Sequence, residues 1–475
     1  EERIRCVAER VGVAGDALDV GVARDHPVAA LPEGVIVVRD RILPAQGSEQ
    51  LVREAVCKGR RIVEHHGILT QDFTRVQKYV GMMPVHPDDL FRSEAHAWLE
   101  GHAPALRARR AAVTNDRDQF EAGRAWQREL FDGGWAGISW PVEYGGRGAT
   151  PAQASIFAEE QAGFGVSSGF VGSTIGMVGP VLLSHGTVAQ RSRFLRPLLR
   201  ADETWCQLFS EPSAGSDLAN LATRADRDGD EFVVNGQKVW TSNAHVCDFA
   251  ILLARTNPDV PKHQGITFIL LDLRAPGIEV RPLRQITGAA HFNEVFLTDV
   301  RVPIADVVGE IDKGWVPARA VLAHEASVIG GGNAAALGYA GLVALAHERD
   351  RGCEPVMRQR LAHAYAVEQI LQYMRGRVRS SVRGGGRPEI DGSVMKVLWS
   401  EARRQRAELG VALLGAGGAL HDEWPIQLLE QFSGTIGGGT NEVHRTMIGE
   451  RVLGLPPESR VDRDVSYREL VTRRA

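Results

Sequence analysis

The sequence predicts an α+β protein of several domains, in which a strand-rich middle segment lies between two helical segments. Apolar residues recur at helical spacing early in the chain, at Phe91, Ala95, Trp98 and Leu99. The period changes beyond residue 206, where 232–240 reads as strand, turn and strand with an Asn-Gly pair at the turn. Helical patterning then returns at 316–349, 356–381, 393–415 and 440–453.

The expected domain boundaries follow these changes of pattern. At 475 residues the chain is long enough for more than one domain. We expect a helical domain over 89–205, a strand-rich domain over 206–310, a second helical domain over 311–457 and a tail over 458–475. Residues 1–88 carry no motif that we can assign, and we expect them to form an N-terminal extension, either a small appended domain or a docking segment.

Composition excludes several classes of function. A net charge of -4 gives no basic surface, so we expect no nucleic-acid partner. No apolar run reaches the roughly 18–20 residues of a membrane helix, and the first residues do not read as a secretory leader. The five cysteines are scattered and odd in number, which favours a reducing, cytoplasmic location over a disulfide framework. No cysteine or histidine spacing suggests a metal site.

The most informative segment is 205–217, WCQLFSEPSAGSD. It is a turn-rich loop whose hydroxyls and unhindered amides could surround a phosphate or the polar edge of a ring; the donors are Ser210, Ser213, Gly215 and Ser216. About 25 residues later, 238–243 (KVWTSN) reads as a strand that carries Trp240 and ends in small polar residues. An indole suits the face of an aromatic ring.

Together with three other motifs, these segments resemble the acyl-CoA dehydrogenase family. The others are 134–146 (GWAGISWPVEYGG), 293–303 (NEVFLTDVRVP) and 437–454 (GGGTNEVHRTMIGERVLG). The four motifs stand in the family's order and cover roughly residues 89–457. The resemblance implies an N-terminal helical domain, a β-barrel-like middle domain and a C-terminal four-helix bundle.

The resemblance also implies an activity, α,β-dehydrogenation of an acyl thioester with FAD as cofactor. A base removes the α-hydrogen as a proton, and the β-hydrogen leaves as a hydride to the flavin. The thioester could be carried by coenzyme A or by an acyl carrier protein, and the expected electron acceptor is an electron-transfer flavoprotein. Members of the family work as homo- or hetero-oligomers, in which FAD often lies between subunits.

The proton-accepting residue needs a separate argument, because the usual position is occupied by glycine. Many family members carry a glutamate two residues before the threonine of the C-terminal motif, and Gly438 stands there. A second subset places the glutamate on a helix, and Leu322 to Glu325 matches that context, so Glu325 is the candidate base. Ala326 replaces the arginine that usually follows, which removes a charge that would lower the carboxyl pKa. Such members act on branched, long or polycyclic acyl groups, which favours a bulky substrate.

The resemblance assigns cofactor contacts to further residues. Phe209 and Ser210 are expected at the flavin's pyrimidine edge, Ser216 with Gly215 at the pyrophosphate, Trp240 against the ring system and Ser242 near the reactive nitrogen. The segment that reaches a neighbouring subunit's FAD keeps Arg349 but lacks the family's phenylalanine. Gly415 and Gly417 resemble the glycine loop at the adenine end, and Thr440 and Asn441 begin the last helix of the motif, where free amides could meet phosphate or ribose.

Other interpretations of these residues remain open. The serines could cap turns, Trp240 could belong to the core, Arg349 and Arg351 could form a solvated charge run, and Thr440 could be an ordinary helix cap. Two alternative functions also remain. One is an oxygen-using monooxygenase or oxidase on the same fold, which needs no base at Gly438, and the other is a non-catalytic subunit of a heteromeric dehydrogenase.

Overall fold

The structure is a computed structural model that describes residues 36–37, 62–63, 86–113, 115–329, 338–383, 389–420, 422–459 and 462–474, with only the backbone for 36–37, 62–63, 323–329, 379, 381–383, 389–391 and 474. The chain divides into two units, 1–85 and 86–475. In the first unit the described residues are two short parallel strands, β1 (Ile36–Val37) and β2 (Ile62–Val63). The rest of the expected N-terminal extension lies outside the described residues.

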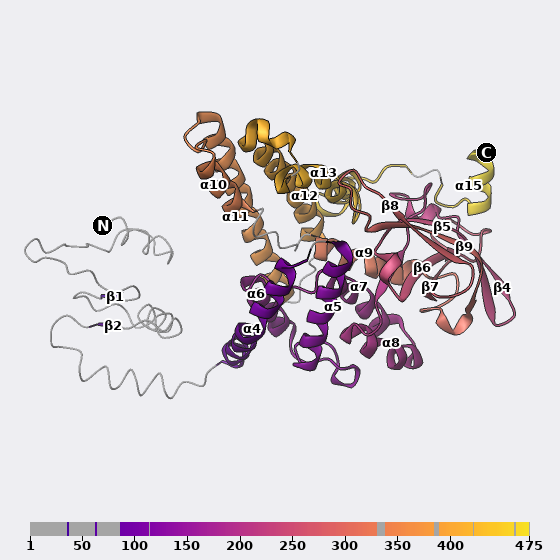
Figure 1. Ribbon diagram of the computed structural model, residues 1–475. Coiled ribbons are helices and arrows are strands. Elements are labelled where there is room, and N and C mark those ends of the chain that lie inside the picture. The colour runs from indigo at the N-terminus through magenta and orange to yellow at the C-terminus, as the bar shows by residue number, and fades with distance from the viewer. Residues whose placement is uncertain are drawn as a thin grey trace, which may run out of the picture. The chain divides into compact units, whose positions relative to one another are not determined.

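The second unit begins with helices (Figure 1): α4 (Pro87–Ala111), α5 (Asp116–Asp132), α6 (Pro151–Gly163), α7 (Gly169–His185) and α8 (Val188–Arg200). Threonines fix two of the starts. Thr150 and Thr187 each accept a hydrogen bond from the backbone N–H three residues on, while the glutamines at those positions, Gln153 and Gln190, bond back to the threonine N–H. These reciprocal bonds satisfy amides that a helix start leaves unpaired.

The motif at 134–146 is a packing feature of this helical domain. Trp135 is 3% exposed and stacks on Phe157 of α6, with ring centroids 5.0 Å apart. Trp140 fills the space beside α7 at Gly179, where any side-chain carbon would collide with the indole. The tryptophans therefore fasten the loop between α5 and α6 to its neighbours, which is a structural role.

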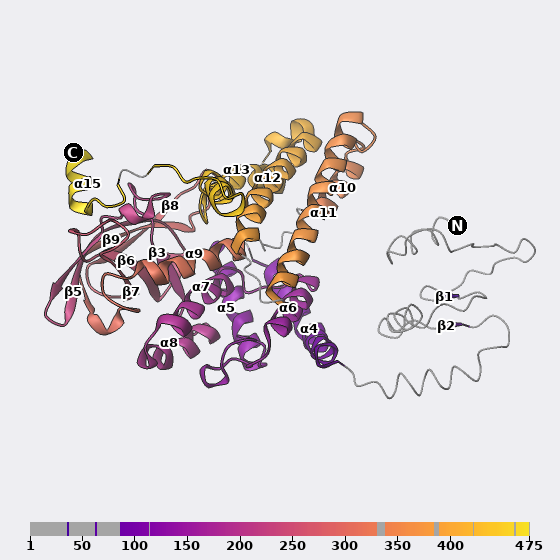
Figure 2. The ribbon, with the colours of Figure 1, turned by 180° about the vertical axis from the view of Figure 1, so that it is seen from behind.

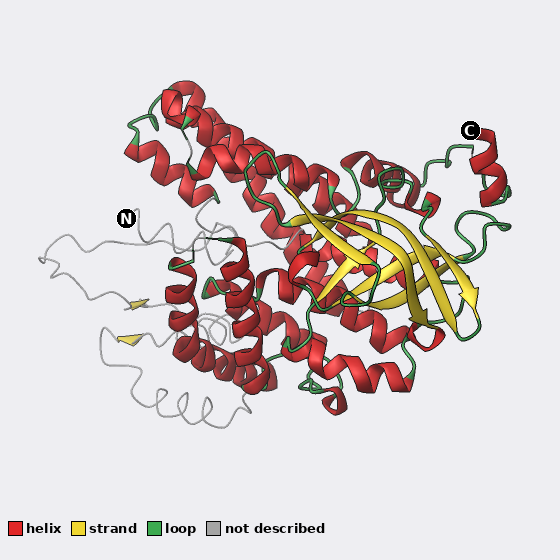
Figure 3. Cartoon of the chain, turned by 45° about the vertical axis from the view of Figure 1, so that its right-hand side comes forward, coloured by secondary structure: helices red, strands yellow, loops and turns green. Residues whose placement is uncertain are grey.

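The middle segment forms a seven-stranded sheet in the order β3-β6-β4-β5-β9-β8, with β7 paired to β6. The strands are β3 (Trp205–Leu208), β4 (Arg224–Asp228), β5 (Glu231–Ser242), β6 (Phe249–Arg255), β7 (Ile266–Asp272), β8 (Ile278–Leu283) and β9 (Phe292–Pro303). The long, curved strands are clear in Figure 3. Every residue of β6 is buried, as its continuous apolar sequence predicts.

The predicted Asn-Gly turn is wrong, because β5 runs unbroken from Glu231 to Ser242. Gly236 instead lies at an irregularity in the β5–β9 pairing, and it lets the strand approach Thr223 too closely for a side chain. Asn235 exchanges two hydrogen bonds of 3.0 Å with Asp299 of β9. The tight turn lies earlier, where Asp228 pairs with Glu231 and Gly229 has φ of 61°.

The chain ends in a second group of helices, among which α11, α12 and α13 pack side by side (Figure 2). They are α9 (Trp315–Ile329), α10 (Tyr339–Glu348), α11 (Pro355–Arg383), α12 (Glu389–Leu414), α13 (Glu423–Ile436), α14 (Asn441–Met447) and α15 (Tyr467–Arg474), with a π-helical turn η6 (Ile448–Val452). The predicted order of helical, strand-rich and helical segments is confirmed. None of the helices described here is long and apolar enough to cross a membrane.

Candidate active site

The loop that follows β3 presents unused polar groups. The hydroxyls of Ser210, Ser213 and Ser216 make no hydrogen bond to any residue that the structure describes. No atom lies within 4 Å of the place where a side chain on Gly215 would begin. Phe209 is 2% exposed, and its ring meets Phe268 edge-on in the core, so only its backbone could face a ligand. We call residues 210–217 the serine loop.

Trp240 stands beside the serine loop in an unusual backbone conformation. Its φ is 62°, in the left-handed region, and the regular pairing of β5 with β9 is interrupted between Lys238 and Thr241. This conformation costs a bulky residue about 1–3 kcal/mol and is typical of functional sites. The indole is 61% exposed and meets Phe292 edge-on at 6.0 Å. A flat aromatic face is therefore held out of the core, while Ser242 ends the same strand.

A buried ion pair joins the serine loop to the strand that carries Trp240. The Lys238 side chain is fully buried, and its Nζ lies 2.8 Å from Glu211 Oε1 and 3.0 Å from the carbonyl of Phe209. Glu211 also accepts the backbone N–H groups of Ala222 and Thr223, at 2.6 and 2.9 Å. The pair thus holds the start of the serine loop against β5, and Glu211 also binds the backbone that follows the loop.

Burial and charge oppose each other in this pair. Burial disfavours the Glu211 carboxylate, but the Lys238 ammonium and the backbone donors overcome that effect and hold the carboxyl pKa below its usual range. Burial lowers the pKa of Lys238, and the charge of Glu211 counteracts it. Sequence analysis missed both residues. The visible signals were a lysine in a strand pattern and a glutamate in an otherwise small-residue loop.

A second group of predicted residues lies at the opposite end of the molecule. Arg349 follows α10, and its half-exposed side chain lies 3.4 Å from Glu348. Arg351, which sequence analysis left as a possible solvated charge, donates to the carbonyls of Ala412 and Leu413 at the end of α12 and also pairs with Glu354 at 2.7 Å. Its Nη1 would lie 3.7 Å from a side-chain carbon at Gly415. Arg351 therefore shapes the glycine segment 415–419, which includes Gly417.

Within one chain the two groups are far apart. The turns after α10 and α12 lie together at the free end of the helical bundle, whereas the sheet lies at the other side of the molecule (Figures 1 and 3). The two groups of predicted cofactor contacts therefore lie in different parts of the second unit.

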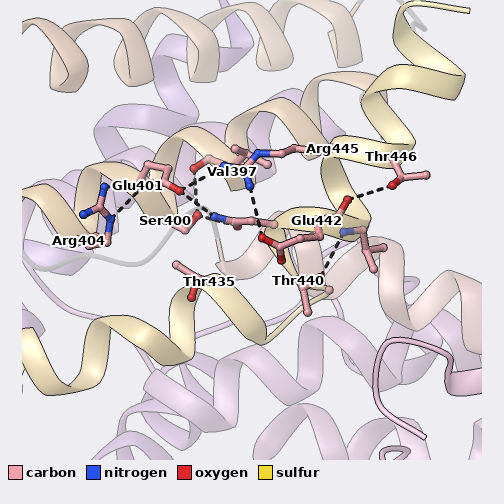
Figure 4. Close-up of polar contacts among 12 residues, drawn as sticks. Val397, Ser400, Glu401, Arg404, Thr435, Thr440, Glu442, Arg445 and Thr446 are labelled. Carbon is pink, nitrogen blue, oxygen red and sulfur yellow. Dashed lines mark hydrogen bonds and ion pairs between the residues drawn. The ribbon is translucent and has the colours of Figure 1, made fainter. Parts of the chain in front are cut away.

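The helix α14 begins at a network of polar contacts with α12 (Figure 4). Thr440 caps the helix by accepting the N–H of Val443 at 3.2 Å. The buried side chain of Asn441 accepts from Lys396 and Ser400, at 3.0 and 2.9 Å, and donates to Glu401 at 3.3 Å. The side-chain amide of Asn441 is therefore occupied by hydrogen bonds within the bundle. A ligand at this place would contact the backbone at the start of α14 instead.

Lys396 also fixes the glycine turn that precedes α14. Its Nζ donates to the carbonyls of Gly439 and Thr435, at 2.6 and 3.4 Å. His444 Nε2 lies 2.9 Å from the carbonyl of Gly438. Gly438 and Gly439 have φ of 67° and 87°, conformations that a glutamate adopts only under strain. A side chain at either position would therefore strain the turn as it stands in this protein.

Burial lowers the pKa of Lys396 to about 8. Between pH 8 and the pKa of about 10.4 in an unfolded chain, the unfolded state binds more protons here than the native state. The stability that this residue contributes must therefore rise with pH across that interval. We expect the thermal midpoint of the wild-type protein, relative to that of Lys396→Met, to increase between pH 8 and 10. A midpoint difference that stays constant with pH would contradict the assignment.

The candidate base, Glu325, lies on α9, but its side chain is outside the described residues. The first half of the helix is well anchored, since Ala318 and Val321 are fully buried in the main core. Helix α9 packs against α7 and β7. Among the described residues, no group of acidic, histidine or cysteine side chains is arranged to hold a metal ion.

Three family models match the second unit in order. They are the acyl-CoA dehydrogenase N-terminal domain over residues 88–202, the middle domain over 206–300 and the C-terminal domain over 312–453. The chain belongs to the acyl-CoA dehydrogenase family. It is an oxidoreductase of a family whose members depend on FAD, and the resemblance seen in the motifs is confirmed.

Several members of the acyl-CoA dehydrogenase family are similar over most of the chain. The acyl-CoA dehydrogenase IpdE1 of Mycobacterium tuberculosis is 38% identical over 383 residues, covering 78% of this chain and 98% of the relative. A solved structure titled Tcur3481-Tcur3483 steroid ACAD is 31% identical with a TM-score of 0.68, covering 79% of this chain and 99% of that one. The ChsE4-ChsE5 complex from Mycobacterium tuberculosis is 29% identical with a TM-score of 0.63, covering 79% and 100%.

Proposed function

We propose that this acyl-CoA dehydrogenase oxidises a coenzyme A thioester with a bulky, ring-containing acyl group, using FAD and passing electrons to an electron-transfer flavoprotein. The observation that carries the proposal is the serine loop fastened to an outward-facing Trp240 by Lys238 and Glu211. The acyl class is supported by the solved structure titled Tcur3481-Tcur3483 steroid ACAD and by a 29% identical relative named cyclohexane-1-carbonyl-CoA dehydrogenase, from Geobacter metallireducens.

The residues present fit FAD. Free hydroxyls at Ser210 and Ser216 suit its polar edges and phosphates, Gly215 leaves room for close approach, and the exposed indole of Trp240 suits an aromatic ring. When bound, FAD supplies the acceptor for the hydride that leaves the β-carbon of the substrate. The residues of the protein orient the thioester and accept the α-proton.

Glu325 is the proposed proton acceptor. The α-hydrogen of a thioester is a weak acid, so the carboxylate must be more basic than it is in water. At the next position the sequence has Ala326 where the family usually has an arginine, so it lacks the positive charge of that arginine. Gly438 has no side chain that could accept a proton. The turn that contains it is held by His444 and Lys396, and it leads into α14.

We further propose that the site is completed by a second chain. The serine loop and the segment around Arg349, Arg351 and Gly415 lie at opposite ends of one molecule (Figure 1). If both contact cofactor, we expect them to contact two different molecules of it. Two of the similar structures have titles that name two proteins each, which supports an oligomer of identical or related chains.

Anaerobic titration tests the reaction. The purified, yellow protein is mixed with a steroid side-chain thioester, cyclohexanecarbonyl-CoA, isovaleryl-CoA or palmitoyl-CoA, and the flavin absorbance is followed. We expect bleaching with ring-containing substrates, and recovery of the colour on adding an electron-transfer flavoprotein. The same acyl groups attached to an acyl carrier protein test whether the enzyme uses that thioester or the coenzyme A thioester. Oxygen uptake with a hydroxylated product would support an oxygenase instead, and a colourless protein would support a non-catalytic subunit.

A further inference from the structure

The C-terminal segment 462–474, beyond the 312–453 covered by the C-terminal family model, returns to the middle domain. Ser466 pairs with Pro261 in an isolated antiparallel bridge. The backbone N–H groups of Tyr467 and Arg468 donate to the carbonyls of Val260 and Pro258, both at 2.9 Å. Leu470 of α15 is 7% exposed. We call 462–474 the C-terminal strap; backbone pairing and a buried apolar side chain fix its position.

The strap reaches the serine loop through Lys262. The ammonium of Lys262 lies 2.9 Å from both carboxylate oxygens of Asp217, the last residue of the loop, and 2.6 Å from Asp462 of the strap. Only 10% of the lysine side chain is exposed. One buried cation therefore joins a loop carboxylate to a strap carboxylate.

Arg255 makes a second connection. It is 4% exposed, and its guanidinium donates to the carbonyls of Ala219 and Leu221, at 2.7 and 3.4 Å, just beyond the serine loop. It also donates to the carbonyl of Lys262 at 2.8 Å. The ring of Tyr467 covers the guanidinium, with Cζ 4.0 Å from the ring centroid. Such cation–π contacts are strongest where water is excluded.

We propose that the C-terminal strap closes the far end of the serine loop, so that retention of the cofactor depends on Asp462 and Tyr467 as positioning residues. The near end of the loop is held by Lys238 and Glu211 from within the middle domain. At the far end, Lys262 and Arg255 hold the loop, and the strap supplies a partner to each of them. Without the strap, water reaches both cations and the loop gains conformational freedom. The claim that the strap affects retention of the cofactor rests on the proposed function.

Removal of residues 458–475 and two point variants, Asp462→Asn and Tyr467→Leu, test the inference. Release of FAD from each is followed by the fluorescence gained on dissociation. We expect release to become about 10-fold to 100-fold faster on truncation and several-fold faster in each point variant, since hydrogen bonds to charged groups are the stronger ones. If the truncated chain does not fold, the two point variants decide.

A matched control stays on the strap. Arg468→Ala removes a surface pair with Asp259, 2.6 Å long, that touches neither Lys262 nor Arg255. This control should release FAD at the wild-type rate. Equal release rates in all variants, including Asp462→Asn, would overturn the inference.

A second measurement does not depend on FAD. Hydrogen exchange of residues 211–223 in the cofactor-free protein should become faster in Asp462→Asn and Tyr467→Leu but not in Arg468→Ala. Unchanged exchange in that segment would refute the strap even if the protein binds FAD. A wild-type protein that never binds FAD, with exchange altered as expected, would refute the proposed function and leave the strap's action on the loop in place.

Discussion

Glu325→Gln should retain FAD and lose reduction of the flavin by substrate. Glutamine keeps the size of the side chain and cannot accept the α-proton. General-base catalysis contributes about 10²–10⁴-fold, so the rate of anaerobic bleaching should fall by at least that range. Stopped-flow absorbance with the preferred thioester gives the rate, and the visible spectrum before mixing shows whether the cofactor is still held.

The matched control is Glu100→Gln, which neutralises an exposed glutamate on α4. It should bleach at the wild-type rate and have the wild-type spectrum. If Glu325→Gln also bleaches normally, the proton acceptor lies elsewhere and the assignment of Glu325 is wrong. A colourless Glu325→Gln protein would point to a role for Glu325 in cofactor binding, contrary to the proposal.

Lys238→Met should destabilise the protein strongly and release the cofactor. It leaves Glu211 in the interior with its two backbone donors but without its cation. Breaking a buried pair by removing one partner costs about 3–5 kcal/mol, because the remaining charge is uncompensated. The thermal midpoint and the FAD content after gel filtration measure the two effects.

Two further variants separate charge from packing. Lys238→Met combined with Glu211→Leu removes the stranded carboxylate and should recover much of the lost stability, since apolar replacement of a whole buried pair is often neutral or favourable. It should not recover cofactor binding, because the contacts that position the serine loop remain absent. Lys313→Met, which breaks the exposed pair with Glu310, should have no measurable effect. A Lys238→Met protein as stable as Lys313→Met would contradict the importance of the buried pair between Lys238 and Glu211.

Local patterns predicted a large part of the fold. The helical spacing of Phe91, Ala95 and Leu99 was read correctly, because all three lie on the buried face of α4. The apolar runs of β6 and β7 are typical of strands that are buried on both faces, as these are. The Asn-Gly pair at 235–236 misled, because Asp299 and Thr223, distant in sequence, determine the backbone there.

The candidate site was predicted less completely. The hydroxyl-rich composition of the serine loop and the indole after it predict a cofactor face, which stays a prediction. Ser213, Gly215 and Ser216 are exposed, and Trp240 is 61% exposed. Lys238, Lys396 and Arg351 were not identified as organising residues, although each fixes a segment that carries predicted contacts. Many of their partners are backbone carbonyls, which every residue has, so the sequence does not show which segment each side chain holds.

The sequence by itself determined the family, the order of the helical and strand-rich segments, and which residue types are available for proton and hydride chemistry. These depend on local pattern and on motifs that are contiguous in the chain. Tertiary structure alone decided that Lys262 joins Asp217 to Asp462, since those carboxylates are 245 residues apart in the chain. Such a contact forms because burial makes an unpaired charge costly, and only the folded chain shows which charges become buried together.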